Sequence, residues 1–237
     1  AQIGNVLDAE CYEIHFSLTW PQPPDIIAPV GNRTIVPGNG LAGAYTVGAT
    51  GDFISLTAIL DSLTETFITA PVTIELLNNY NSSNETFPIN FPFIYGSSTE
   101  NKITLRPSIN AANISIAGNG SAILKFENSN NITIDGRPGG VGEERHLTIQ
   151  NEDTSGSAIR VTGGSKNIDI SYSNILGSSL SEVNGVVQSS YSGYNLSSDS
   201  ISFRNSYIGK SNSGRPANGF YFGPEMYGGS LGWRIVN

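Results

Sequence analysis

Apolar and polar residues alternate in a series of short segments that begins near residue 72 and runs to the end of the sequence. Apolar residues, many of them β-branched, take every second position, as in strands with one buried face. Gly, Asn or Ser closes each segment, so we expect short strands joined by tight corners. No helical pattern of useful length separates them. The segments are 72–76, 102–107, 113–118, 122–126, 131–136, 146–151, 158–164, 167–175, 199–209 and 219–223.

A looser repeat connects these segments. Ile132, Ile168 and Ile201 hold matching places in NITIDG, NIDISY and DSISFR, at intervals of 36 residues (168 − 132) and 33 residues (201 − 168). A period of this size is typical of solenoids, in which each coil buries its inner face only against its neighbours. The sequence therefore predicts an all-β fold, a right-handed parallel β-helix. A β-sandwich is the alternative, and the scarcity of tight hairpin turns between long alternating runs disfavours it.

The chain is expected to have two parts. Residues 1–42 contain a strand-like segment at 11–20 and then a Pro- and Gly-rich stretch, which predicts an extended connector. Residues 43–237 form the solenoid. Within it, 55–67 is predicted to be an amphipathic helix that caps the first coil, whose edge would otherwise be unpaired. The apolar face of this helix consists of Leu56, Ile59, Leu60, Leu63 and Phe67.

Three polar stretches, 78–101, 137–145 and 189–198, are predicted to be loops that leave the coils. The sequence ends on a strand-like segment with no visible cap. We therefore expect the solenoid to continue beyond Asn237 in the full-length protein, or another chain to cover this end. Residues 1–20 and the open C-terminal coil are the candidate surfaces for self-assembly.

Composition narrows the partners and the compartment. The net charge of −8 and the absence of any basic run exclude a nucleic-acid partner and disfavour binding to anionic lipid. No stretch is long and apolar enough to span a membrane. Cys11 is the only cysteine, so the chain has no internal disulfide. The weakly charged, Gly-rich composition and the Ala-Gln start without Met are those of an exported, processed protein, although an arbitrary boundary would give the same start.

Residues 43–79 carry the most specific motifs: Tyr45-Thr46-Val47-Gly48, Gly51-Asp52-Phe53, Leu56-Thr57-Ala58-Ile59 and Ala70-Pro71-Val72-Thr73-Ile74. This stretch resembles the opening of secreted parallel β-helix proteins of the pectin-lyase-like type in Bacteroidetes-like bacteria. The resemblance extends over 43–237. It implies a surface or exported protein, a cargo of type IX secretion, that contacts a polysaccharide or a cell-surface or secretion-machinery protein. The fold itself hosts lyases, hydrolases, adhesins and spacers, so it does not define an activity.

Catalytic chemistry finds little support. Hydrolysis of a glycan needs two carboxylates, and the candidates are Asp135, Asp169 and Asp199. The paired-Asp and Gly-His-Gly patterns of polygalacturonase-like enzymes are missing, so we interpret these residues as solvated or turn-forming. His146 has no second His near it in the sequence, which makes a poor metal site. We predict no catalytic residue, no metal ligand and no cofactor.

Binding is the simpler hypothesis. Exposed aromatic rings stack on sugars because they offer a flat apolar face, and the candidates are Tyr191, Tyr194, Tyr207 and Tyr221. Tyrosines that close coil corners are the competing interpretation. Separately, Ser62 and Ser200 lie in Asp-Ser-Leu and Asp-Ser-Ile, which fit a short O-glycosylation pattern associated with Bacteroidetes.

The sequence thus favours a non-catalytic structural or adhesive solenoid, located outside the cell or on its surface, that contacts a glycan or a protein. A polysaccharide lyase or glycoside hydrolase of the same fold is the alternative. A filament subunit or secretion cargo is the second alternative.

Overall fold

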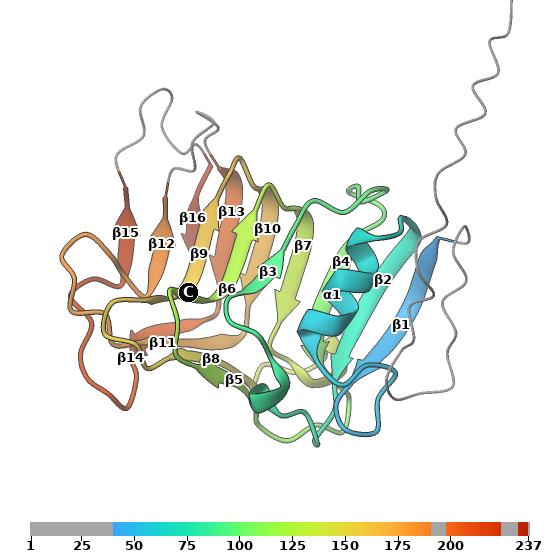
Figure 1. The fold of residues 1–237 in the computed structure, drawn as a ribbon, viewed down its shortest axis with the longest axis horizontal. Coiled ribbons are helices and arrows are strands. Elements are labelled where there is room, and N and C mark those ends of the chain that lie inside the picture. Colours follow the sequence, from blue (N-terminus) through green and yellow to red (C-terminus); the bar gives the residue numbers. More distant parts are fainter. Residues whose placement is uncertain (1–39, 191–197, 224–231, 237) are drawn as a thin grey trace, which may run out of the picture.

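The computed structural model describes residues 40–190, 198–223 and 232–236. The strand-like segment at 11–20 and the Pro-rich stretch after it lie outside the described residues. Figure 1 shows strands that wind in successive coils along one axis. Every pair of named strands is parallel, and the strands form three sheets along that axis. The architecture is therefore a parallel β-helix, a solenoid.

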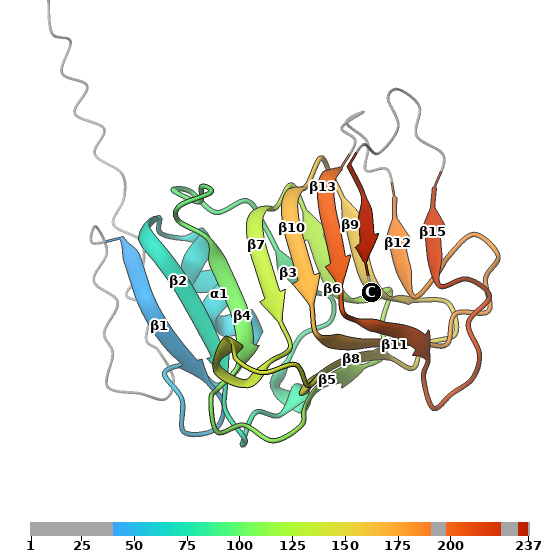
Figure 2. The same ribbon diagram turned by 180° about the vertical axis from the view of Figure 1, so that it is seen from behind.

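Sheet A runs the length of the solenoid. Its strands in spatial order are β1 (Leu41–Val47), β2 (Ile68–Leu76), β4 (Ile103–Pro107), β7 (Asn130–Asp135), β10 (Lys166–Ser171), β13 (Asp199–Arg204) and β16 (Arg234–Val236). Figure 2 shows these strands side by side from the other side of the molecule.

Two shorter sheets complete each coil. Sheet C consists of β5 (Ile114–Gly118), β8 (Leu147–Asn151), β11 (Ser173–Gly177) and β14 (Tyr207–Lys210). Sheet B consists of β3 (Ile89–Phe91), β6 (Ala122–Glu127), β9 (Ser157–Thr162), β12 (Val187–Ser189) and β15 (Phe220–Phe222). In a complete coil the chain passes from sheet A to sheet C, then to sheet B, and back to sheet A.

The isoleucine repeat sets the register of sheet A. Ile168 pairs with Ile132 on one side and with Ile201 on the other, and Ile170 pairs with Ile134 and Phe203. All five side chains are at most 1% exposed. The predicted solenoid repeat is confirmed. The β-sandwich alternative is wrong, because neighbouring strands run parallel and close one core between them.

The core is a single apolar column that continues from coil to coil. Stacking extends to aromatic residues: Phe91 and Phe126 occupy paired positions of sheet B, and their ring centroids are 4.9 Å apart. Burying a large apolar side chain contributes roughly 1.5–3 kcal/mol. Because each coil covers the inner side chains of the next, this stabilisation is available only when the register is kept.

Two predicted strands are each split by a corner. The predicted segment 167–175 becomes β10 and β11, with Tyr172 between them at φ 49°. The segment 199–209 becomes β13 and β14, with Asn205 at φ 48° near the same corner. The alternation of apolar residues continues through these corners, so it hides them. Each corner turns the chain from sheet A to sheet C.

The helix α1 (Leu56–Thr64) is shorter than the predicted 55–67. Ser55 caps it, its Oγ accepting from the Ala58 amide at 3.1 Å, and the Glu85 carboxylate accepts from the Leu56 amide at 2.6 Å. It lies against β3, in the place that sheet B strands take in later coils. Phe67 is not on its buried face: this residue follows the helix and is 42% exposed.

Other boundaries also differ from expectation. The predicted loop 78–101 contains β3, and β1 begins at Leu41, two residues before the expected start of the solenoid at residue 43. The loop 137–145 contains a short 3₁₀ turn at Pro138–Gly140, and most of 189–198 lies outside the described residues. Among the described residues, no helix is long and apolar enough to cross a membrane.

The stacked core makes a direct prediction about stability. Replacing Ile170, which is fully buried between two coils, with alanine should lower the free energy of unfolding by about 3 kcal/mol, because the cavity is closed on both sides. Lys166→Ala, an exposed change on the same strand, should stay within about 0.5 kcal/mol of the parent. Chemical denaturation measures both. Equal effects of the two variants would contradict the stacked core.

Candidate functional site

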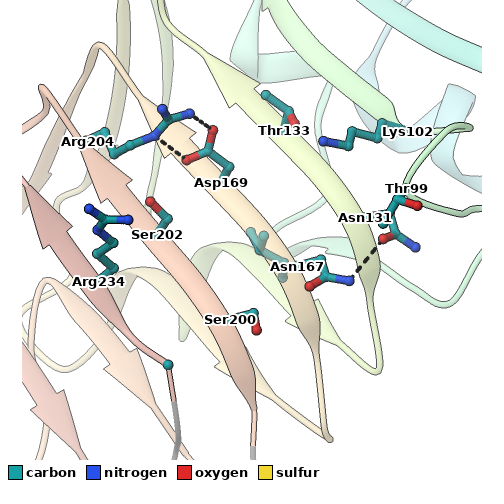
Figure 3. A pocket seen from close by; sticks show the side chains of 12 residues that line it. Thr99, Lys102, Asn131, Thr133, Asn167, Asp169, Ser200, Ser202, Arg204 and Arg234 are labelled. Atoms are coloured by element: carbon teal, nitrogen blue, oxygen red, sulfur yellow. Dashed lines mark hydrogen bonds and ion pairs between the residues drawn. The ribbon is translucent and has the colours of Figure 1, made fainter.

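A shallow groove lies on the outer face of sheet A. It has a volume of about 430 Å³ and crosses β4, β7, β10, β13 and β16 near their N-terminal ends. Figure 3 shows its side chains rising from neighbouring strands toward the same opening. The lining residues are Thr99, Lys102, Asn131, Thr133, Asn167, Ile168, Asp169, Ser200, Ser202, Arg204, Gly232 and Arg234.

Strand alternation creates the polar floor of this groove. Thr133, Asp169 and Ser202 each stand between two buried apolar residues, so their side chains point outward. The three residues are directly paired across β7, β10 and β13. The same row continues to Thr104 on β4 and to Arg234 on β16. The groove is thus a consequence of in-register stacking: equal positions in successive coils form one continuous surface.

A second row of side chains edges the groove at the start of the strands. Asn131, Asn167 and Ser200 occupy equivalent positions and all have left-handed backbone, with φ of 57°, 54° and 56°. Asparagine adopts this conformation more readily than most residues. The Asn167 side-chain amide donates to the Asn131 amide oxygen at 3.1 Å, as Figure 3 shows. The edge therefore offers a row of polar side chains in a fixed geometry.

One ion pair crosses the groove. Arg204 donates from Nε to the Asp169 carboxylate at 2.9 Å, and its Nη2 contacts the second carboxylate oxygen. Such a bidentate pair fixes both side chains. The hydrogen bond to Asp169 raises the pKa of Arg204, so the guanidinium stays charged. Asp169 is therefore a paired carboxylate, and the interpretation of this residue as merely solvated is wrong.

Two further cations stand at opposite ends of the groove. Lys102 precedes β4 and Arg234 begins β16. Both are exposed, and within the described part of the chain neither has a carboxylate in ion-pair distance. In Figure 3 they lie on either side of the Asp169–Arg204 pair. The groove is therefore locally cationic on a chain whose net charge is −8.

A neighbouring cluster lies at the corner between sheets A and C. Asp135 accepts two hydrogen bonds from the Arg137 guanidinium, at 2.9 and 2.7 Å, and one from its backbone amide. Arg137 also covers the ring of Tyr172, 4.4 Å from its centroid. The Asp135 bonds raise the pKa of Arg137. Asp135 is 7% exposed, so the expected solvated or turn-forming role is wrong for this residue too.

These pairs limit the chemistry that the groove can perform. Paired-carboxylate hydrolysis needs one protonated and one ionised carboxyl group on either side of the sugar bond. Among the described residues that line the groove, Asp169 is the only carboxylate, and Arg204 neutralises it. The described residues also contain no group of three or more His, Cys, Asp or Glu side chains that could hold a metal ion. The arrangement instead suits hydrogen bonding and charge pairing with a polar ligand.

The four tyrosines selected from the sequence do not form this groove. Tyr207 lies on β14 of sheet C and is 50% exposed, whereas Tyr221 lies on β15 of sheet B. The two residues therefore belong to different faces of the solenoid. Tyr191 and Tyr194 lie outside the described residues, as do residues 1–20 of the predicted assembly surface.

The two serines with the short glycosylation pattern differ in accessibility. Ser62 is 2% exposed, and its hydroxyl donates to the Ala58 carbonyl inside α1. A glycan could not be attached there without disturbing the helix. Ser200 is exposed at the edge of the groove, so its modification stays a prediction.

Sequence reasoning missed the two cations that define the groove. Lys102 and Arg234 are 132 residues apart (234 − 102), and only stacking places them on one face. The signal that could have found them is the outward position in each repeated strand, read across coils. Asp169 and Arg204 were recognised as outward residues of such strands, but their pairing was not.

The chain matches no family model, and no curated protein or solved structure is similar enough to count as a relative. The class of protein therefore rests on the fold: the chain is a parallel β-solenoid of about five coils. The comparisons give no support to the pectin-lyase-like type or to an origin in Bacteroidetes.

The polar edge of the groove predicts a strict backbone requirement. Ser200→Val should lower the free energy of unfolding by about 1–2 kcal/mol, because a β-branched residue is strained at φ 56°. Ser200→Gly should not lower it, since glycine adopts this conformation without strain. Thermal and chemical denaturation of the two variants measure the difference. A valine variant as stable as the glycine variant would contradict the left-handed edge.

Proposed function

We propose that this chain is a non-catalytic structural or adhesive solenoid, exported to the cell surface or the extracellular space, whose groove on sheet A binds a glycan. The observation that carries the proposal is the in-register polar floor of the groove. Thr133, Asn167 and Ser202 present hydroxyl and amide groups at regular strand intervals. Neighbouring strands are about 4.8 Å apart, close to the length of one pyranose in an extended chain. An extended glycan lying along the axis would thus meet one strand with each sugar.

The ion pairs support binding without catalysis. Glycan hydrolysis uses a carboxylic acid whose proton is available, and the groove holds Asp169 in a bidentate pair with a charged arginine. A fixed pair of this kind positions donors and acceptors at no further entropic cost, which favours recognition of hydroxyl groups. No observation favours the lyase or hydrolase alternative over this function.

Location and family are the finer parts of the proposal. The low charge content of 14%, the single cysteine and the Gly-rich composition support an exported solenoid. The motifs in 43–79 support a relationship with secreted pectin-lyase-like β-helix proteins of Bacteroidetes-like bacteria. Fractionation of the source cells, with an antibody against the solenoid, tests the location; recovery of the chain only from the cytoplasm would contradict it.

The binding function makes a prediction that one groove variant tests. In a panel of soluble polysaccharides, the chain should bind at least one glycan and leave its length unchanged. Ser202→Trp places a large side chain on the groove floor and should abolish that binding. Asn90→Trp, on the outer face of sheet B, should leave it intact.

Affinity electrophoresis and size-exclusion analysis of the glycan measure binding and cleavage separately. Depolymerisation of the bound glycan would overturn the non-catalytic assignment. Binding that survives Ser202→Trp would place the glycan elsewhere.

A further inference from the structure

Building on the proposed glycan-binding function, we propose that the groove selects a linear acidic heteroglycan in which about three neutral sugars separate successive acid groups. This selectivity follows from where the groove places its charges, which the proposed function alone does not specify.

The two ends of the groove are cationic. Lys102 stands beside Thr99 at the β4 end, and Arg234 stands at the β16 end. Neither cation has an ion-pair partner among the residues that the structure describes. An ammonium or guanidinium group that faces a binding groove without a partner gains most from a carboxylate or sulfate on the ligand.

The middle of the groove is neutral. Arg204 and Asp169 cancel each other, and the surrounding lining consists of hydroxyl and amide side chains. A ligand carboxylate seated there would lose water without gaining a free cation, and it would face the Asp169 carboxylate. Neutral sugars suit this part, because hydroxyl groups match the Thr133, Asn167 and Ser202 side chains.

The distance between the two cations sets the spacing of the acid groups. The strands between the two ends follow in the order β4, β7, β10, β13 and β16, which is four steps. At the usual strand separation these steps span roughly 19 Å along the solenoid axis. With one sugar to a strand, an acid group over Lys102 and the next over Arg234 belong to sugars four units apart. The matching ligand therefore has a tetrasaccharide repeat with a single acid group.

A uniformly acidic glycan fits less well for a second reason. The chain has a net charge of −8, which repels a dense polyanion from every side except the cationic ends. A neutral glycan avoids this repulsion but leaves Lys102 and Arg234 without partners. The expected order of affinity is sparsely acidic above both uniformly acidic and neutral.

Calorimetric titration with three defined probes tests this order. Gellan oligosaccharides carry a single glucuronate in each tetrasaccharide repeat, oligogalacturonate carries a carboxylate on every sugar, and a linear β-glucan carries none. We expect the gellan oligosaccharides to bind at least about tenfold more tightly than either comparison probe. Raising the salt concentration should weaken this binding and leave any binding of the neutral glucan unchanged.

Variants connect the preference to the two cations. The double variant Lys102→Ala/Arg234→Ala should lose the preference for gellan, a fall of about tenfold in affinity. The double variant Lys102→Arg/Arg234→Lys should retain it. Lys210→Ala removes a comparable exposed charge from β14 on sheet C and should have no effect. An unchanged thermal midpoint confirms that each variant is folded.

The outcomes separate the two proposals. Equal or tighter binding of oligogalacturonate or β-glucan would overturn the charge-spacing inference while the glycan-binding function stands, and so would an alanine double variant that keeps the gellan preference. If no member of this panel or of the wider polysaccharide panel binds, both proposals are wrong.

Discussion

Parallel stacking in register is the constraint on which the rest of this structure depends. Each coil contributes only a few inward side chains, too few to form a core alone, so the apolar column is stable only when Ile132, Ile168 and Ile201 lie over one another. The same register determines the outside of the molecule. Residues one position away must face solvent, and they too align from coil to coil. The core and the groove are therefore two results of a single arrangement.

The outer face of sheet A shows how this arrangement concentrates charge. The chain has few ionisable residues, 14% of the total, yet several of them meet on this face. Most are neutralised in pairs: Arg106 with Glu75, Arg137 with Asp135, and Arg204 with Asp169. Exposed pairs of this kind add little to stability. Their consequence is to fix the side chains and to leave Lys102 and Arg234 as the cations available to a ligand.

The alternation of apolar residues predicted the fold class and most strands correctly, because each strand buries one face and period two records that directly. It could not locate the corner at Tyr172, where a single residue with left-handed backbone turns the chain while the alternation continues. It also missed β3, since Ile89–Phe91 is short and lies in a stretch interrupted by proline. The aromatic face expected for α1 was wrong only at Phe67, where the helix has already ended.

The groove was harder to predict than the fold, for a physical reason. Its residues come from five strands, and their contacts depend on which residue of one coil pairs with which residue of the next. Alternation shows that Asp169 and Arg204 face outward, but only the register brings them together. Choosing ligand-binding residues by type alone led instead to Tyr207 and Tyr221, which the fold places on two different sheets.

The account's central claim is that the outer face of sheet A is where this solenoid meets its ligand. An NMR map of backbone amide shifts during titration with the bound glycan tests it most directly. The account predicts that the largest shifts fall on Thr133, Asn167, Asp169 and Ser202, across adjacent strands of one sheet. Shifts centred on sheet B or sheet C, with those four amides unmoved, would contradict it.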